Sequence, residues 1–100
     1  MSTSVINSVI IRLILANRAD VLSTVLKTIS DLGGAVGAID IIRIDEDDTV
    51  TRDITINTSG EEHADKISEA LENLDGVRVR NMSDRTFLLH LGGKIEVISK

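Results

Sequence analysis

The chain has 100 residues, which is enough for one domain and leaves little room for a second. It carries 11 Lys and Arg against 16 Asp and Glu, and this net charge of −5 disfavours nucleic acid and anionic membranes as partners, because both need a basic surface. The absence of cysteine excludes a disulfide framework, a thiolate metal site and a cysteine nucleophile. The N-terminus has no basic leader and no apolar run reaches the ~18 residues of a membrane span, so we expect a cytoplasmic protein.

A strand followed by a helix is predicted at the N-terminal end. Residues 9–15 alternate in polarity, and one face carries Val9, Ile11, Leu13 and Leu15. The stretch NRADVLSTVLKTISDLGG then has helical spacing, and we expect Asn17 or a neighbour to cap the helix. Gly33 and Gly34 should end it, because glycine readily adopts a positive φ. The buried stripe of this helix is expected at Leu22, Val25, Leu26, Ile29 and Leu32.

Two strands joined by an acidic turn, a hairpin, are predicted next. Residues 36–44 are rich in isoleucine, and residues 49–57 alternate in polarity. In the second strand Val50, Ile54 and Ile56 should face inward and Thr51, Asp53, Thr55 and Asn57 outward. Arg52 interrupts the apolar face near the start of this strand. The four acidic residues at 45–48 could attract a hard cation, but calcium loops need interleaved ligands and a turn glycine, so we interpret them as a solvated turn.

A second amphipathic helix and a fourth strand complete the predicted order. Ser59 and Glu62 have the spacing of a capping box, and Gly76 should end the helix. The buried stripe of this helix is expected at Ala64, Ile67, Leu71 and Leu74. A strand over residues 77–82 then follows. The order β-α-β-β-α-β predicts an α+β, ferredoxin-like fold: a four-stranded antiparallel sheet with both helices on one face.

Several activities that such a fold can host are disfavoured by the sequence. Phe87 is the only aromatic residue, whereas RNA binding on the sheet needs aromatic stacking platforms. His63 is interpreted as a surface residue of the second helix and His90 as a structural residue of an apolar strand, with no sequence neighbour that suggests a triad. Acyl-phosphate hydrolysis stays as a remote alternative, because Arg18 follows the first strand but no glycine-rich cradle surrounds it. Arg12, Arg78 and Arg80 are interpreted as surface charges.

The loop LANRADVL is the remaining candidate site. It joins the end of the first strand to the start of the first helix, where outward-pointing backbone N–H groups can receive a carboxylate. Asn17 adds a hydrogen-bonding amide and Arg18 adds a cation. The alternative is that these residues only cap the helix.

The segment NRADVLSTVLKTISDLGGAVGAIDIIRI resembles the opening of an ACT domain, a regulatory module of metabolic enzymes that shows Asn-Arg-Pro-Gly-hydrophobic-Leu after its first strand. The resemblance covers residues 9–82. It implies side-by-side homodimers whose sheets join, and a small ligand, usually an amino acid, held at the interface by this loop. The ligand-binding residues it implies are Asn17, Arg18, Ala19, Asp20, Val21 and Leu22. Ala19 and Asp20 stand where Pro and Gly are usual, and Asp20 should repel a carboxylate and attract an ammonium group.

The C-terminal segment SDRTFLLHLGGKIEVISK resembles the junction between an N-terminal ACT domain and the catalytic part of bacterial NAD-dependent malic enzymes. This resemblance implies a regulatory domain at 1–83 and, at 84–100, a connector containing an extra strand. It also implies that the catalytic residues, NAD and the Mg²⁺ or Mn²⁺ site lie outside this chain, so we expect no catalysis, cofactor or metal site in it. The alternative function is a purely structural dimerisation domain whose ligand site is lost.

Overall fold

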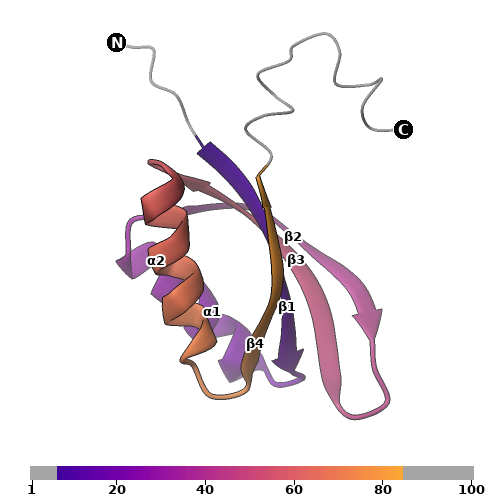
Figure 1. Cartoon of the computed structure of the whole chain (residues 1–100). Coiled ribbons are helices and arrows are strands. Elements are labelled where there is room, and N and C mark those ends of the chain that lie inside the picture. The colour runs from indigo at the N-terminus through magenta and orange to yellow at the C-terminus, as the bar shows by residue number, and fades with distance from the viewer. Residues whose placement is uncertain (1–6, 85–100) are drawn as a thin grey trace, which may run out of the picture.

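One antiparallel sheet and two helices make up residues 7–84, the part of the chain that the computed structural model describes (Figure 1). The elements in chain order are β1 (Asn7–Ala16), α1 (Ala19–Asp31), β2 (Ala35–Ile44), β3 (Thr49–Thr58), α2 (Glu61–Glu72) and β4 (Val77–Asp84). The strand order is β2-β3-β1-β4, and every neighbouring pair is antiparallel. Both helices cover the same face of the sheet (Figure 1). The predicted ferredoxin-like α+β fold is therefore confirmed; the extra strand predicted beyond residue 84 falls outside the described residues.

The core lies between the helices and the inner face of the two central strands. The inward faces predicted for β1 and β3 are confirmed, because the residues expected to face inward are buried in both strands. Thr51, expected on the outward face of β3, is nevertheless only 6% exposed. The main core side chains are Val9, Ile11, Leu13 and Leu15 of β1, Ile54 and Ile56 of β3, Val21, Val25 and Ile29 of α1, and Ala64, Ile67 and Leu71 of α2. Branched aliphatic residues suit this packing, because strands carry them well and helices can cover them.

The buried face of α1 differs from the stripe that the sequence predicts. Val21 is only 3% exposed, whereas Leu32, expected in the stripe, is 40% exposed. The helix ends at Asp31, and Gly33, with φ of 88°, turns the chain away, so Leu32 lies beyond the last helical turn. The N-cap residue of α1 is Arg18, the neighbour of Asn17, and no side-chain hydrogen bond caps the start of this helix.

The start of α2 is built around His63 and not around a capping box. The N-cap is Gly60 and makes no side-chain capping bond, so the prediction of a Ser59–Glu62 box is wrong. Instead, the backbone N–H of Ser59 donates to Nδ1 of His63 at 2.9 Å, and Nε2 of the same ring lies 2.7 Å from the carbonyl oxygen of Leu32. These partners require an acceptor at Nδ1 and a hydrogen at Nε2. His63 therefore joins the start of α2 to the end of α1.

The acidic segment at residues 45–48 forms the turn between β2 and β3. Asp45 accepts hydrogen bonds from the hydroxyl groups of Thr49 and Thr51 and pairs with Arg43. Asp47 accepts a bond of 2.7 Å from Thr49. Within residues 7–84, no three His, Asp or Glu side chains are grouped to hold a metal ion. The carboxylates of this turn are thus either used within the hairpin or exposed, as the interpretation of a solvated turn expects.

Neither helix of the described residues combines the length and the hydropathy that crossing a membrane requires.

Candidate functional site

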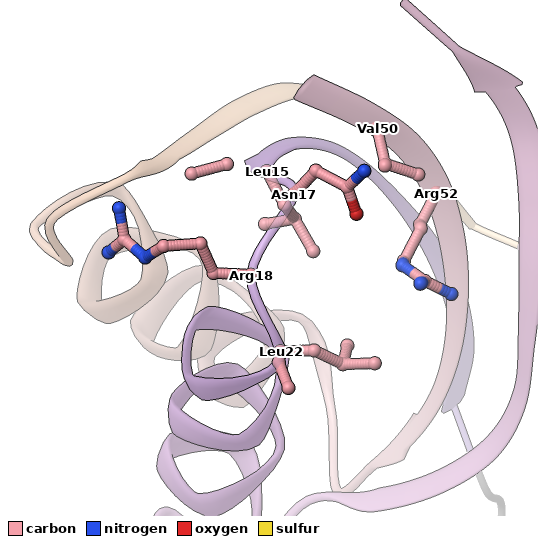
Figure 2. Close-up of a pocket in the computed structure, with 8 residues that line it drawn as sticks. Leu15, Asn17, Arg18, Leu22, Val50 and Arg52 are labelled. Atoms are coloured by element: carbon pink, nitrogen blue, oxygen red, sulfur yellow. The ribbon is translucent and has the colours of Figure 1, made fainter. Parts of the chain in front are cut away.

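A pocket of about 290 Å³ opens where β1 ends and α1 begins (Figure 2). It is formed by the end of β1, the loop that follows, the first turn of α1 and the start of β3. Its lining residues are Leu15, Ala16, Asn17, Arg18, Ala19, Leu22, Val50 and Arg52. The candidate loop of the sequence is therefore one wall of a pocket, and β3 supplies the opposite wall.

The six loop residues named from the sequence fall into two groups. Those that line the pocket are Asn17, Arg18, Ala19 and Leu22. Asp20 does not line it; its carboxylate accepts a hydrogen bond of 3.2 Å from Nε of Arg18, and the two side chains are 75% and 56% exposed. Val21 points into the core and is buried. The repulsion of a carboxylate expected from Asp20 is weakened by this pairing, because Arg18 neutralises its charge locally.

Arg52 is a pocket residue that the sequence analysis did not assign to the site. Its position in the register places it between Leu13 of β1 and Ile41 of β2. Leu13 is fully buried on the helix-covered face, so Arg52 shares that apolar face and reaches the pocket along it. The only sequence signal was that a cation interrupts a run of inward-facing apolar residues.

Arg52 differs from the other arginines of the described chain in its burial and in its lack of a partner. Arg12 donates two hydrogen bonds to Asp53, at 2.8 and 3.0 Å, across β1 and β3. These bonds, and then the charge of Asp53, raise the pKa of Arg12 above its usual value. Arg18 and Arg43 also pair with aspartates, whereas Arg78 and Arg80 are exposed on β4. Within residues 7–84, Arg52 is the arginine that is both partly buried and without a hydrogen bond or ion pair to the protein.

The side chains around the pocket point in distinct directions. In Figure 2 the Asn17 amide and the Arg52 guanidinium lie on the same side of the loop, with Val50 and Leu22 beside them. The Arg18 guanidinium extends to the opposite side. The groups that line this pocket in the described part of the chain are guanidinium, amide and aliphatic. Such groups can bind an anion and cover an apolar body.

A strand edge with an exposed apolar face adjoins the pocket. β2 pairs with β3 and with no other strand of residues 7–84, and all ten of its residues are exposed. Its inner-face residues stand opposite the inner-face residues of β3, but the helices do not bury them. We call this set the apolar edge: Val36, Ile39, Ile41 and Ile44. Since Ile44 and Ile41 pair with the pocket residues Val50 and Arg52, the apolar edge continues from the pocket wall.

Comparison with known proteins relates the chain to one class of enzyme. It is 45% identical over 78 residues, 78% of its length, to the NAD-dependent malic enzyme of Geobacillus stearothermophilus. It is 32% identical over 80 residues, 79% of its length, to NAD-dependent malic enzyme 1 of Bacillus subtilis strain 168. The chain is thus homologous to bacterial NAD-dependent malic enzyme over most of its length. It spans only 16% and 18% of the length of these two relatives.

The other comparisons concern the fold. No family model matches the chain, so the ACT identity suggested by its loop stays a prediction. The crystal structure of a homoserine dehydrogenase from Thiobacillus denitrificans superposes with a TM-score of 0.65 and 19% identity, over 81% of this chain and 18% of that one. At this identity the likeness supports the fold and says nothing about the ligand.

Proposed function

We propose that the chain is a regulatory segment of an NAD-dependent malic enzyme, an ACT-type domain that binds a small metabolite or amino acid and dimerises in the cytoplasm. The observation that carries this proposal is the homology over 78% of the chain to a malic enzyme of which it spans only 16%. The parent enzyme would oxidatively decarboxylate malate to pyruvate. NAD and Mg²⁺ or Mn²⁺ would bind outside this chain, which would itself be non-catalytic and joined to the catalytic domain through residues 84–100.

Ligand binding is assigned to the pocket beside Asn17. Two features support this assignment: the pocket is bounded by the loop that resembles the ACT ligand loop, and it presents hydrogen-bonding groups beside aliphatic ones. The pocket also adjoins the apolar edge through the register of β2 with β3. A ligand there can therefore favour one arrangement of two domains over another, which is regulation by population shift. A coupling of ~1–3 kcal/mol would be typical of such a module.

Dimerisation is assigned to the β2 edge. This strand leaves a row of backbone N–H and C=O groups without a strand partner in the described part of the chain. Its side chains add exposed apolar surface, with Ile41 55% and Ile44 66% exposed. A long apolar edge of this kind invites pairing with another strand, and a second copy would join the two sheets.

The ligand part is tested by a thermal-shift screen of the full chain with the common amino acids, malate, fumarate, aspartate and succinate. A ligand at 100 times its dissociation constant should stabilise the fold by ~2.7 kcal/mol. The second candidate function, a purely structural dimerisation domain, is favoured by the same apolar edge and needs no ligand. A cooperative melt that no compound shifts would support that second function against the first.

The dimer part is tested by sedimentation of the full chain over a range of concentrations. Ile41→Lys places a charge in the middle of the apolar edge and should shift the dimer towards monomer. Leu32→Lys is the matched control, because Leu32 is also an exposed hydrophobic residue, 40% exposed, but lies at the end of α1 and not on β2. A dimer that resists Ile41→Lys, or that Leu32→Lys weakens equally, would contradict the assignment to β2.

A further inference from the structure

We propose that this pocket selects a small aliphatic carboxylic acid that lacks an amino group, and that Arg52 on β3 holds its carboxylate. The assignment rests on the function proposed for the pocket and goes further, because it names the ligand class and the residue that sets it. It also differs from the expectation that the ligand is an amino acid.

The first observation is the unfavourable position of Arg52 in the free protein. Its neighbours in the register are Leu13, which is fully buried, and Ile41, which belongs to the apolar edge. An arginine that is only partly exposed, on an apolar face and without a counter-charge, is less favourable than a paired one, and a bound anion offsets that cost. No residue of the described chain supplies this anion, so a ligand carboxylate is the group that fits. The planar fork of arginine can bind both carboxylate oxygens at once.

The second observation is that Arg18 is not equivalent to Arg52. Its guanidinium is paired with Asp20, largely exposed, and directed to the other side of the loop (Figure 2). An anion bound there would compete with the Asp20 carboxylate and with water. Arg52 instead lies on the same side as Asn17, whose amide can donate a second hydrogen bond to the same ligand.

The third observation is that the pocket offers an ammonium ion no negative charge: the Asn17 amide oxygen could accept a hydrogen bond from it, but no counter-charge from the described residues lines the pocket. Among the residues that line it in the described chain there is no carboxylate. Asp20, the nearest acidic residue in sequence, lies outside the lining and is bound to Arg18. An α-ammonium would therefore enter a cationic site without a counter-charge, which disfavours amino acids relative to their hydroxy or unsubstituted analogues. Leu15, Leu22 and Val50 provide aliphatic walls for the carbon chain.

The test is titration calorimetry of the full chain with two matched series of probes. One series has a branched aliphatic body: leucine, 2-hydroxy-4-methylpentanoate and 4-methylpentanoate. The other has a four-carbon body: aspartate, malate and succinate. In whichever series binds, the hydroxy acid or unsubstituted acid should bind at least about tenfold more tightly than the amino acid. An amino acid that binds as well as or better than its analogues would overturn this assignment while leaving the proposed ligand-binding function intact. Absence of binding by any probe, and by any compound of the thermal-shift screen, would overturn both.

Four variants assign the carboxylate contact. Arg52→Gln should weaken the best probe by about tenfold or more, since it removes a charge-assisted hydrogen bond. Arg52→Lys keeps the charge without the fork and should weaken it less. Arg80→Gln is the matched control: it removes the same charge from an exposed site on β4 that does not line the pocket. Arg18→Gln should weaken binding less than Arg52→Gln does, because the Arg18 guanidinium is already paired with Asp20, and a larger loss there than in Arg52→Gln would overturn the role of Arg52. Melting curves without ligand would verify that each variant is folded.

Discussion

Replacing Gly34 by alanine, which adds a single methyl group, should clearly lower the stability of the fold. A Cβ at this position would lie 2.9 Å from Cγ2 of Ile29, 2.9 Å from Cδ1 of Ile67 and 3.1 Å from Cγ2 of Ile56. All three isoleucines are fully buried, and they belong to α1, α2 and β3. The backbone at Gly34 therefore packs tightly against the junction of both helices with the sheet.

The magnitude of the effect of Gly34→Ala follows from two opposing contributions. Overpacking a filled core by a methyl group costs ~1–3 kcal/mol, and the Cγ2 atoms of Ile29 and Ile56 are held on stiff, branched side chains. Alanine also restricts the unfolded chain, which returns ~0.4–1 kcal/mol. The net expectation is a loss of ~1–2 kcal/mol, or a fall in melting temperature of ~5–15 °C for a domain of this size.

Urea unfolding and thermal melts of Gly34→Ala measure this loss of stability, and Gly37→Ala is the control. At Gly37 the nearest contacts of an added Cβ are 3.7 Å to the carbonyl oxygen of Thr55 and 3.8 Å to its Cγ2, which are ordinary packing distances. The control should therefore stay within ~0.5 kcal/mol of the parent chain, as surface substitutions usually do. A Gly34→Ala chain as stable as the parent would refute the reasoning, because it would mean that the packing around Ile29 and Ile67 yields freely.

The remaining predictions concern the joint between the helices, the turn after α1 and the pocket. His63→Ala removes the acceptor for the Ser59 N–H and the partner of the Leu32 carbonyl, so it should cost ~1 kcal/mol in urea unfolding and speed amide exchange at Ser59. Gly33→Ala should cost ~1–2 kcal/mol in urea unfolding, because the φ of 88° at this position is unfavourable for a residue with a Cβ. A variant as stable as the parent chain would contradict this strain. Arg52→Leu should raise the free energy of unfolding by ~0.5–1 kcal/mol, because it completes an apolar face. The same variant should abolish probe binding in calorimetry. A less stable variant would contradict the unfavourable cost assigned to the unpaired cation.

The element order and the inward faces of the central strands could be predicted from the sequence, because they depend on local periodicity. The alternation around Ile11 and Ile54 predicts two half-buried strands, and the structure pairs these two residues directly. The stripe of α2 was predicted for the same reason, since Ala64, Ile67 and Leu71 repeat at helical spacing and are buried. The helix ends were harder to predict, because His63 acts through the distant carbonyl of Leu32, which a local capping motif cannot indicate.

The candidate site could be predicted only in part, for a physical reason. The loop at Asn17 follows directly from chain order, so its place at the end of β1 was foreseeable. The opposite wall depends on the register that sets Arg52 against Leu13 and Ile41, which is a tertiary property. Likewise, the isoleucines of β2 look like core residues in the sequence, and only the strand order shows that they lie at an edge.

Two features that disfavour the isolated fold are neighbours on the same pair of strands. Arg52 places an unpaired cation on an apolar face, and Ile41, directly opposite it on β2, leaves an apolar side chain in solvent. Each is unfavourable alone, and each would be relieved by a different partner: an anion for Arg52 and a second sheet for Ile41. Because a ligand on Arg52 would act one residue pair away from the proposed dimer edge, the two binding events should influence each other. Thermodynamic linkage then requires that the factor by which a ligand strengthens or weakens the dimer equals the factor by which dimerisation changes ligand affinity. A register pair of this kind would give the proposed regulatory segment a short physical path from its pocket to the proposed dimer edge.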